Sequence, residues 1–146
     1  MANNSLGYQI YEALLKAFGV GAEAVTALFN DDATIEFPYA PSIGAKGKQN
    51  MEAYRNHLEG GLKNMPHLKF SDIRVYRLQE EGTYWAEAHG ECTILSTGIL
   101  YQQDYVMYFK LKGGKFSFYR EYSNPLPALK AFGGAQATLD MFNVNK

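Results

Sequence analysis

The first half of the chain contains stretches in which apolar residues recur every three to four positions. From Ser5 to Ala17 this spacing predicts an amphipathic helix, with Ser5 as its N-cap and Gly19 after its last turn. The same spacing predicts helices over Gly21–Asn30 and Lys48–Met65. Because each helix has one apolar face, all three are expected to pack against another layer of the fold.

One strand is predicted between the second and third helices. Residues from Ala33 to Tyr39 alternate between two faces, as in a short strand. Pro38 and Pro41 favour an edge position, since proline donates no backbone hydrogen bond to a neighbouring strand.

After Pro66 the period changes to two, which predicts four consecutive strands. Short glycine-containing turns separate them and suit antiparallel hairpins. A last helix is predicted over Leu126–Phe132, followed by a weakly patterned tail. The order of elements predicts an α+β fold, with three helices on one face of a curved sheet. The predicted strand ranges are Lys69–Leu78, Thr83–Leu95, Tyr101–Leu111 and Lys115–Ser123.

Length and composition describe one globular domain over residues 1–146. Hydrophobic residues make up 47% of the chain, and 14 basic residues balance 15 acidic ones. The absence of a basic run argues against nucleic acid as a partner. No apolar stretch is long enough for a membrane span or a secretion signal, so we expect a cytoplasmic protein. The single cysteine, Cys92, excludes an internal disulfide and a thiolate zinc site.

The Tyr101–Leu111 strand has one face that is apolar at one end and polar at the other. This pattern is typical of a strand that runs from a packed core to the wall of a partly polar cavity. A plain core face, with two tyrosine hydroxyls that reach water, explains it equally well. The residues of this face are Tyr101, Gln103, Tyr105, Met107, Phe109 and Leu111.

Glu121 is the candidate acid or base. It shares a face of the last strand with Tyr119. If this face points inward, loss of hydration raises the pKa of the carboxyl and suits it to proton transfer near neutral pH. Otherwise Glu121 is a surface carboxylate paired with Arg120 or Lys115.

The orientation of the Thr83–Leu95 strand stays open at this level. Glu87, His89 and Glu91 share one face. If this face points inward, the three side chains would form a catalytic row or a site for a divalent metal ion. We predict no metal site, because no other histidine has a sequence context that brings it near His89. If that face points outward, the small residues Ala88 and Gly90 face inward and leave room for a ligand.

Several segments resemble the SnoaL-like, nuclear-transport-factor-2-like superfamily. They are the Asp-Asp-Ala-Thr run of residues 31–41, the helix entry at Gly47, the turn before Tyr101, and the Arg-Glu-Tyr-Ser-Asn-Pro-Leu segment 120–126. The last segment is most similar to the phenazine-biosynthesis A/B proteins, in which its acidic residue is an acid/base group in a cavity. Glu121 occupies that position here. The resemblance implies a cone-shaped antiparallel or mixed sheet, a cystatin-like roll, with the helices on its concave face.

Other chemistries of the superfamily do not carry over to these residues. The two catalytic Asp residues of ketosteroid isomerases fall at Phe37 and near Met107, which argues against steroid isomerisation. The Arg and second Asp of limonene epoxide hydrolases fall at about Ala88 and Gly90. A histidine of the phenazine proteins falls near Ser71.

The residues and the resemblance together predict an enzyme with a cavity and without a cofactor, acting on a small apolar ring compound. It would be an isomerase, a cyclase, a lyase such as a dehydratase, or a hydrolase. Glu121 would move the proton, one of Tyr101, Tyr105 and Tyr39 would hydrogen-bond a carbonyl or enolate oxygen, with Tyr105 as the candidate catalytic residue, and His89 would assist. The predicted ligand-binding residues are Phe37, Tyr39, Met51, Tyr54, Tyr101, Gln103, Met107 and Tyr119.

Two other functions fit the same sequence. The cavity would hold an apolar ligand without converting it, or the chain would act as a structural domain. The resemblance also implies a homodimer, formed through an outer sheet face that includes Trp85 and Tyr108.

Overall fold

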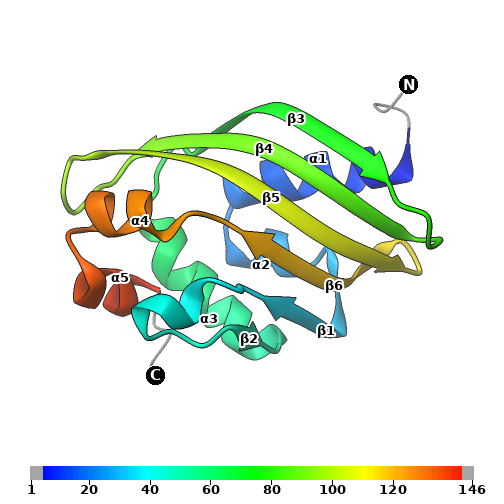
Figure 1. Ribbon diagram of the computed structural model, residues 1–146, viewed down its shortest axis with the longest axis horizontal. Helices are drawn as coiled ribbons and strands as arrows, with labels where there is room; N and C mark the ends of the chain where they lie inside the picture. Colours follow the sequence, from blue (N-terminus) through cyan, green and yellow to red (C-terminus); the bar gives the residue numbers. More distant parts are fainter. Residues whose placement is uncertain (1–4, 143–146) are drawn as a thin grey trace.

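The computed structural model describes residues 5–142. Six strands form one mixed sheet in the order β2-β1-β6-β5-β4-β3 (Figure 1). The strands are β1 (Phe29–Glu36), β2 (Lys48–Gln49), β3 (Lys69–Arg77), β4 (Thr83–Thr93), β5 (Leu100–Lys112) and β6 (Lys115–Tyr122). The helices are α1 (Leu6–Phe18), α2 (Ala22–Thr26), the 3-10 helix η2 (Ala40–Ile43), α3 (Met51–Lys63), α4 (Pro125–Phe132) and α5 (Ala135–Met141).

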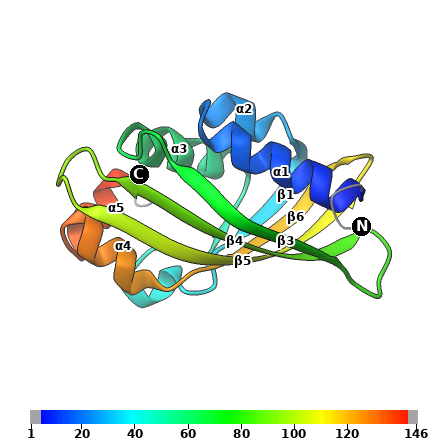
Figure 2. The same cartoon turned by 90° about the horizontal axis from the view of Figure 1, so that it is seen from above.

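The sheet is curved, and α1, α2 and α3 lie on one face of it (Figure 2). The strands from β3 to β6 form an antiparallel meander, and β1 adds parallel to β6. The helices α4 and α5 lie together at one end of the sheet. The predicted α+β fold, with the helices of the N-terminal half on one sheet face, is confirmed.

Local sequence signals explain where the two long helices begin. The Ser5 side chain accepts a hydrogen bond from the Tyr8 N–H at 3.0 Å and caps α1. Asn50 caps α3 in the same way, through the Ala53 N–H at 2.8 Å. Residues Lys48–Gln49, predicted as helix, form β2 instead, because Gln49 pairs with Ile35 of β1. The predicted edge position of β1 is therefore wrong, because β2 pairs with β1 and is itself the edge of the sheet. Pro38 and Pro41 lie after β1 has ended at Glu36.

Two further differences arise from long-range packing. The second helix ends at Thr26 and β1 begins at Phe29, four residues before the predicted start. The Phe29 ring packs 4.8 Å from that of Phe116, and this contact in the core overrides the local helical spacing. The tail after Gly133 contains α5, which packs on α4. Its apolar residues stand at every second position, so the sequence of this short helix shows no helical period.

Regular pairing of β4 with β5 decides which side chains of β4 face the helices. Partners run without a bulge from Thr83 with Lys110 to Thr93 with Leu100. Ala86 and Ala88 are buried on the inner face. The alternate residues, among them Trp85 and His89, therefore lie on the outer face. Association of two copies through this outer face stays a prediction.

No helix within residues 5–142 is both long enough and apolar enough to cross a membrane.

Gly7 allows α1 to approach the sheet. A Cβ atom at this position would overlap the ring of Tyr84, which is buried and stacks on Phe109 at 5.2 Å. We expect Gly7→Ala to lower the free energy of unfolding by about 1–3 kcal/mol, because overpacking outweighs the gain of about 1 kcal/mol in helix propensity. Urea denaturation measures this change.

The matched control is Gly19→Ala, at a position with α-helical backbone angles and an ordinary contact distance of 3.4 Å. Equal stability of the two variants would contradict the packing argument.

Candidate functional site

A cavity of about 170 Å³ lies between the inner sheet face, α3 and the segments around α4 and α5. Most of its wall is aromatic or aliphatic. The predicted catalytic residues Glu121 and Tyr105 both line it. Five predicted ligand-binding residues line it as well: Phe37, Tyr39, Tyr54, Tyr101 and Met107.

Glu121 points into this cavity from the inner face of β6, where it pairs with Met107 of β5. Burial raises the pKa of the Glu121 carboxyl to about 7, and a hydrogen bond of 3.4 Å from the Tyr119 hydroxyl opposes part of that shift. Arg120, the alternative ion-pair partner, lies on the outer face and binds Glu36 at 2.8 Å. Near neutral pH the carboxyl is therefore present in both protonation states.

Two tyrosine hydroxyls provide the next polar group of the cavity wall. The Tyr101 and Tyr105 oxygens are 2.9 Å apart, and burial raises the pKa of both. Both hydroxyls are protonated at neutral pH. One of the two hydroxyl protons forms the hydrogen bond between the two oxygens. The second hydroxyl proton can therefore be donated to a ligand oxygen.

Three of the predicted ligand-binding residues do not line the cavity. Gln103 faces inward, but its amide donates to the Asn124 carbonyl oxygen at 2.8 Å and to the Tyr101 hydroxyl at 3.4 Å. Tyr119 is fully buried behind Glu121. Met51, the first residue of α3, packs against the edge of the core. Gln103 and Tyr119 thus contact residues that line the cavity.

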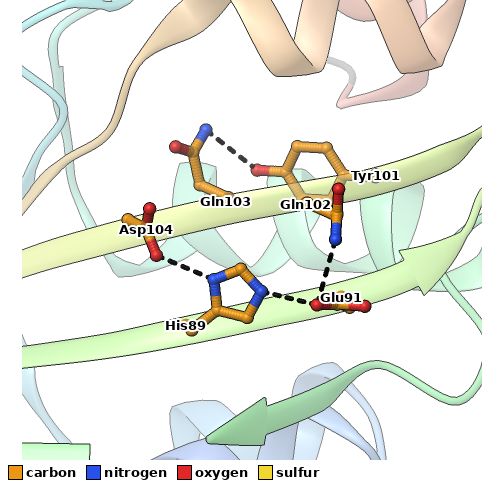
Figure 3. A network of polar contacts seen from close by, with 6 residues as sticks. All are labelled: His89, Glu91, Tyr101, Gln102, Gln103 and Asp104. Carbon is orange, nitrogen blue, oxygen red and sulfur yellow. Dashed lines mark hydrogen bonds and ion pairs between the residues drawn. The ribbon is translucent and has the colours of Figure 1, made fainter. Parts of the chain in front are cut away.

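His89 lies on the outer sheet face, with β4 and β5 between it and the cavity (Figure 3). Its Nδ1 is 2.7 Å from Asp104 and its Nε2 is 2.6 Å from Glu91. These hydrogen bonds raise the pKa of His89. The predicted assistance of His89 in the cavity is therefore wrong, because regular alternation along β4 directs its ring away from Glu121.

The inward position of Gly90 makes room for protein side chains. A Cβ atom there would come within 2.9 Å of the Tyr105 ring and 3.0 Å of the Phe70 ring. The sequence had predicted that Gly90 leaves space for a ligand. Instead it lets two wall residues of the cavity approach the sheet.

Several polar residues of the cavity wall were not predicted from the sequence, and two of them, Gln49 and His57, carry a buried atom without a hydrogen-bond partner within residues 5–142. Gln49 is 6% exposed, and its Oε1 has no hydrogen-bond partner among the described residues; the same is true of Nδ1 of His57. An unpaired buried polar atom costs about 1–3 kcal/mol. One signal was available for His57, since it lies three residues after Tyr54 and hence on the same helix face.

Burial lowers the pKa of His57 to about 4, so its imidazole is neutral near pH 7. Its ring stacks on Phe37 at 5.0 Å and on Phe142 at 4.5 Å between ring centres. Within residues 5–142 no group of three or more His, Cys, Asp or Glu side chains is arranged to hold a metal ion.

Comparison with known proteins gives the family. Residues 11–119 match the SnoaL-like domain. The chain belongs to the SnoaL-like family. This SnoaL-like protein is 32% identical over 110 residues to the uncharacterised protein YesE of Bacillus subtilis, covering 75% of each chain. It is 28% identical to an uncharacterised PhzA/B-like protein of Pseudomonas aeruginosa, over 75% of this chain and 77% of that one.

The fold agrees with solved structures of nuclear-transport-factor-2-like proteins. The crystal structure of a candidate isomerase from Bacillus subtilis superimposes with a TM-score of 0.82 at 28% identity. The match covers 92% of the SnoaL-like protein and 97% of the isomerase chain.

The raised pKa of Glu121 makes stability depend on pH. The folded state binds the carboxyl proton more tightly than the unfolded state, whose pKa is near 4.5. The stabilising contribution is complete below pH 4.5 and is lost as the pH rises through about 7. We expect Glu121→Gln to become more stable relative to wild type by up to roughly 3 kcal/mol between pH 4 and 8.

Urea denaturation at a series of pH values measures this difference. Glu59→Gln, the same substitution at an exposed position of α3, serves as the control and should show no such trend. A flat difference for Glu121→Gln would mean that its carboxyl is hydrated.

The pKa values of His89 and His57 are shifted in opposite directions. The ring protons of His89 should titrate above pH 6.5, because both ring nitrogens face carboxylates. Those of His57 should not change above about pH 5, because its ring is buried. A pH series of NMR spectra, assigned with His57→Phe and His89→Gln, measures both, and a His57 midpoint near 6.5 would be inconsistent with its buried position.

Proposed function

We propose that this protein is an enzyme that transfers a proton within a small ring compound, as an isomerase, cyclase or dehydratase does. One observation carries the proposal: a carboxyl whose pKa is near 7 borders an apolar cavity that also holds a free hydroxyl proton. A general base is most effective when its pKa is close to the working pH. The name of the Bacillus subtilis structure, a candidate isomerase, agrees with this chemistry.

Glu121 is the proposed acid and base. In its ionised form it removes a proton from a carbon next to a carbonyl group, and the protonated carboxyl then returns the proton to another atom of the same molecule. The wall is mostly aromatic and aliphatic, so few groups other than Glu121 can take up the proton.

The Tyr101 and Tyr105 pair is proposed to bind the carbonyl oxygen. The remaining hydroxyl proton donates to this oxygen and stabilises the negative charge that develops on it. Gln103 acts as a positioning residue, because its amide is held by the Asn124 carbonyl oxygen and also donates to the Tyr101 hydroxyl.

Hydrogen–deuterium exchange of 2-cyclohexen-1-one, a small ring ketone, tests the proposed proton transfer. In D₂O the wild-type protein should accelerate exchange at the carbon next to the carbonyl, with a rate that rises through about pH 7 as Glu121 ionises. Glu121→Gln should reduce this acceleration by about 10²–10⁴-fold, as measured by NMR.

Glu59→Gln should leave the exchange rate unchanged, since this carboxyl lies on the solvent side of α3. Exchange at the wild-type rate in a folded Glu121→Gln protein would exclude Glu121 as the base.

A binding protein without turnover is the second candidate. It is favoured by the small number of acidic groups in the cavity. Among the described wall residues Glu121 is the only carboxyl, and His57 is neutral near pH 7 and therefore supplies no second acid. Native mass spectrometry that detects a tightly bound ring compound, in a protein that catalyses no exchange, would support this function.

A further inference from the structure

We propose that the Tyr54 hydroxyl binds a second oxygen atom of the ligand. The ligand is then a ring compound with two hydrogen-bond-accepting oxygens, one on each side of the atom that faces Glu121. The inference rests on the proposed function in taking this cavity as the ligand site. It adds a ligand-contacting residue from α3 and narrows the class of compound that the cavity selects.

The first observation concerns the tyrosines around Glu121. Burial raises the pKa of five of them, and the charge of Glu121 adds to the shift of each. Four of the five hydroxyls have a hydrogen-bond partner: Met107, Glu121 or, for two of them, each other. The Tyr54 hydroxyl is the exception, with no hydrogen-bond partner among residues 5–142. The five residues are Tyr11, Tyr54, Tyr101, Tyr105 and Tyr119.

The second observation is that the Tyr54 hydroxyl is open to the cavity. Within residues 5–142, Gln49 Oε1 and His57 Nδ1 are the side-chain polar atoms that are both unpartnered and closed to solvent. The Tyr54 oxygen is also unpartnered and is not one of these closed atoms, so the 2% of its side chain that stays exposed includes the hydroxyl. Because Tyr54 lines the cavity, a ligand there can reach this group.

The packing of α3 places Tyr54 on the β1 side of Glu121. The Tyr54 ring lies 5.4 Å from that of Phe29, at the start of β1, and 6.3 Å from that of Phe37, just after its end. Phe37 follows the last residue of β1 that pairs with β6, and it therefore lies beside Glu121. Through these two rings the register of the sheet fixes the side from which Tyr54 approaches the carboxyl.

The Tyr101 and Tyr105 pair lies on the other, β5 side of Glu121. Glu121 pairs with Met107 of β5, and Tyr105 is two residues from Met107 on the same face. Diagonal neighbours of this kind are about 7–8 Å apart, within reach of a tyrosine side chain. A ligand that faces Glu121 therefore has one hydroxyl donor on each side, Tyr54 towards β1 and the tyrosine pair towards β5.

These donors set the chemistry of the ligand. Burial raises the pKa of Tyr54, so its hydroxyl keeps its proton at neutral pH and can donate it to an acceptor such as a carbonyl oxygen. Two carbonyl groups that flank one carbon also share the negative charge that develops when this carbon loses a proton, and a hydroxyl donor at each oxygen stabilises that charge. A ligand with one oxygen would leave one of the two donors unpaired.

The volume of the cavity limits the ligand to a small ring. An apolar cavity of about 150 Å³ accommodates benzene. The present cavity, at about 170 Å³, therefore fits one six-membered ring with short substituents.

Glutarimide and 2-piperidone test the inference by isothermal titration calorimetry at pH 8, where Glu121 is mostly ionised. Both are six-membered rings whose N–H group replaces the reacting C–H group and can donate to the carboxylate. Glutarimide has a carbonyl on each side of the N–H, whereas 2-piperidone has one carbonyl. We expect the wild-type protein to bind glutarimide about tenfold more tightly, because only glutarimide pairs with both donors.

Tyr54→Phe removes the hydroxyl and keeps the ring. This variant should bind glutarimide about tenfold more weakly than wild type does, and its affinity for 2-piperidone should change by less than about twofold. Tyr84→Phe is the matched control, because Tyr84 is buried but does not line the cavity. It should keep the wild-type preference for glutarimide.

The stability of the ligand-free Tyr54→Phe protein provides an independent readout. Loss of an unpartnered hydroxyl should leave the urea midpoint unchanged or raise it, whereas loss of a structural hydrogen bond would lower it. A lower midpoint together with an unchanged preference for glutarimide would assign the hydroxyl to the fold and overturn the inference.

Equal glutarimide affinity of wild type and Tyr54→Phe, including failure to bind either, also overturns the inference. These measurements need no proton transfer. Loss of ketone exchange alone would therefore remove the proposed function and leave the assignment of Tyr54. Equal glutarimide affinities, in a protein whose ketone exchange depends on Glu121, would do the reverse.

Discussion

A carboxyl group placed among aromatic and aliphatic side chains is the constraint on which the chemistry of this protein depends. Burial of an ionised carboxylate costs several kcal/mol unless an ion pair or several hydrogen bonds replace its hydration. At Glu121 the Tyr119 hydroxyl supplies one long hydrogen bond, and Arg120 is bound to Glu36 on the other face of the sheet. The part of the burial cost that these contacts do not offset raises the pKa of the Glu121 carboxyl to about 7. The same burial that disfavours the charge gives the carboxyl its capacity to accept and return a proton.

The aromatic wall around Glu121 is assembled from elements that are distant in the sequence. Phe37 follows β1, His57 lies on α3 and Phe142 follows α5, and their rings are stacked in this order. The approach of Phe142 depends on Gly61, since a Cβ atom there would overlap its ring. Because these rings support one another, α5 is part of the site although it carries no candidate catalytic group.

Strand periodicity identified the central part of the cavity because β5 and β6 are regular where they form its wall. Tyr101, Tyr105 and Met107 keep one parity along β5, and all three line the cavity. Gln103 has the same parity, but its amide is turned to the Asn124 carbonyl at the start of α4. Periodicity gives the face of a residue and not the direction of its polar group, which depends on what the chain places nearby.

The sequence alone determined the class of fold, the meander and the parity of Glu121, because alternation along a strand is a local property of the chain. It did not determine which face of β4 points inward, since polar and small residues occupy both parities and only the pairing with β5 distinguishes them. It also did not reveal Gln49 and His57 as cavity residues. Their unpaired atoms become a feature of the molecule only when β2, α3 and Phe142 come together with Phe37, because burial is a property of packing and not of local sequence.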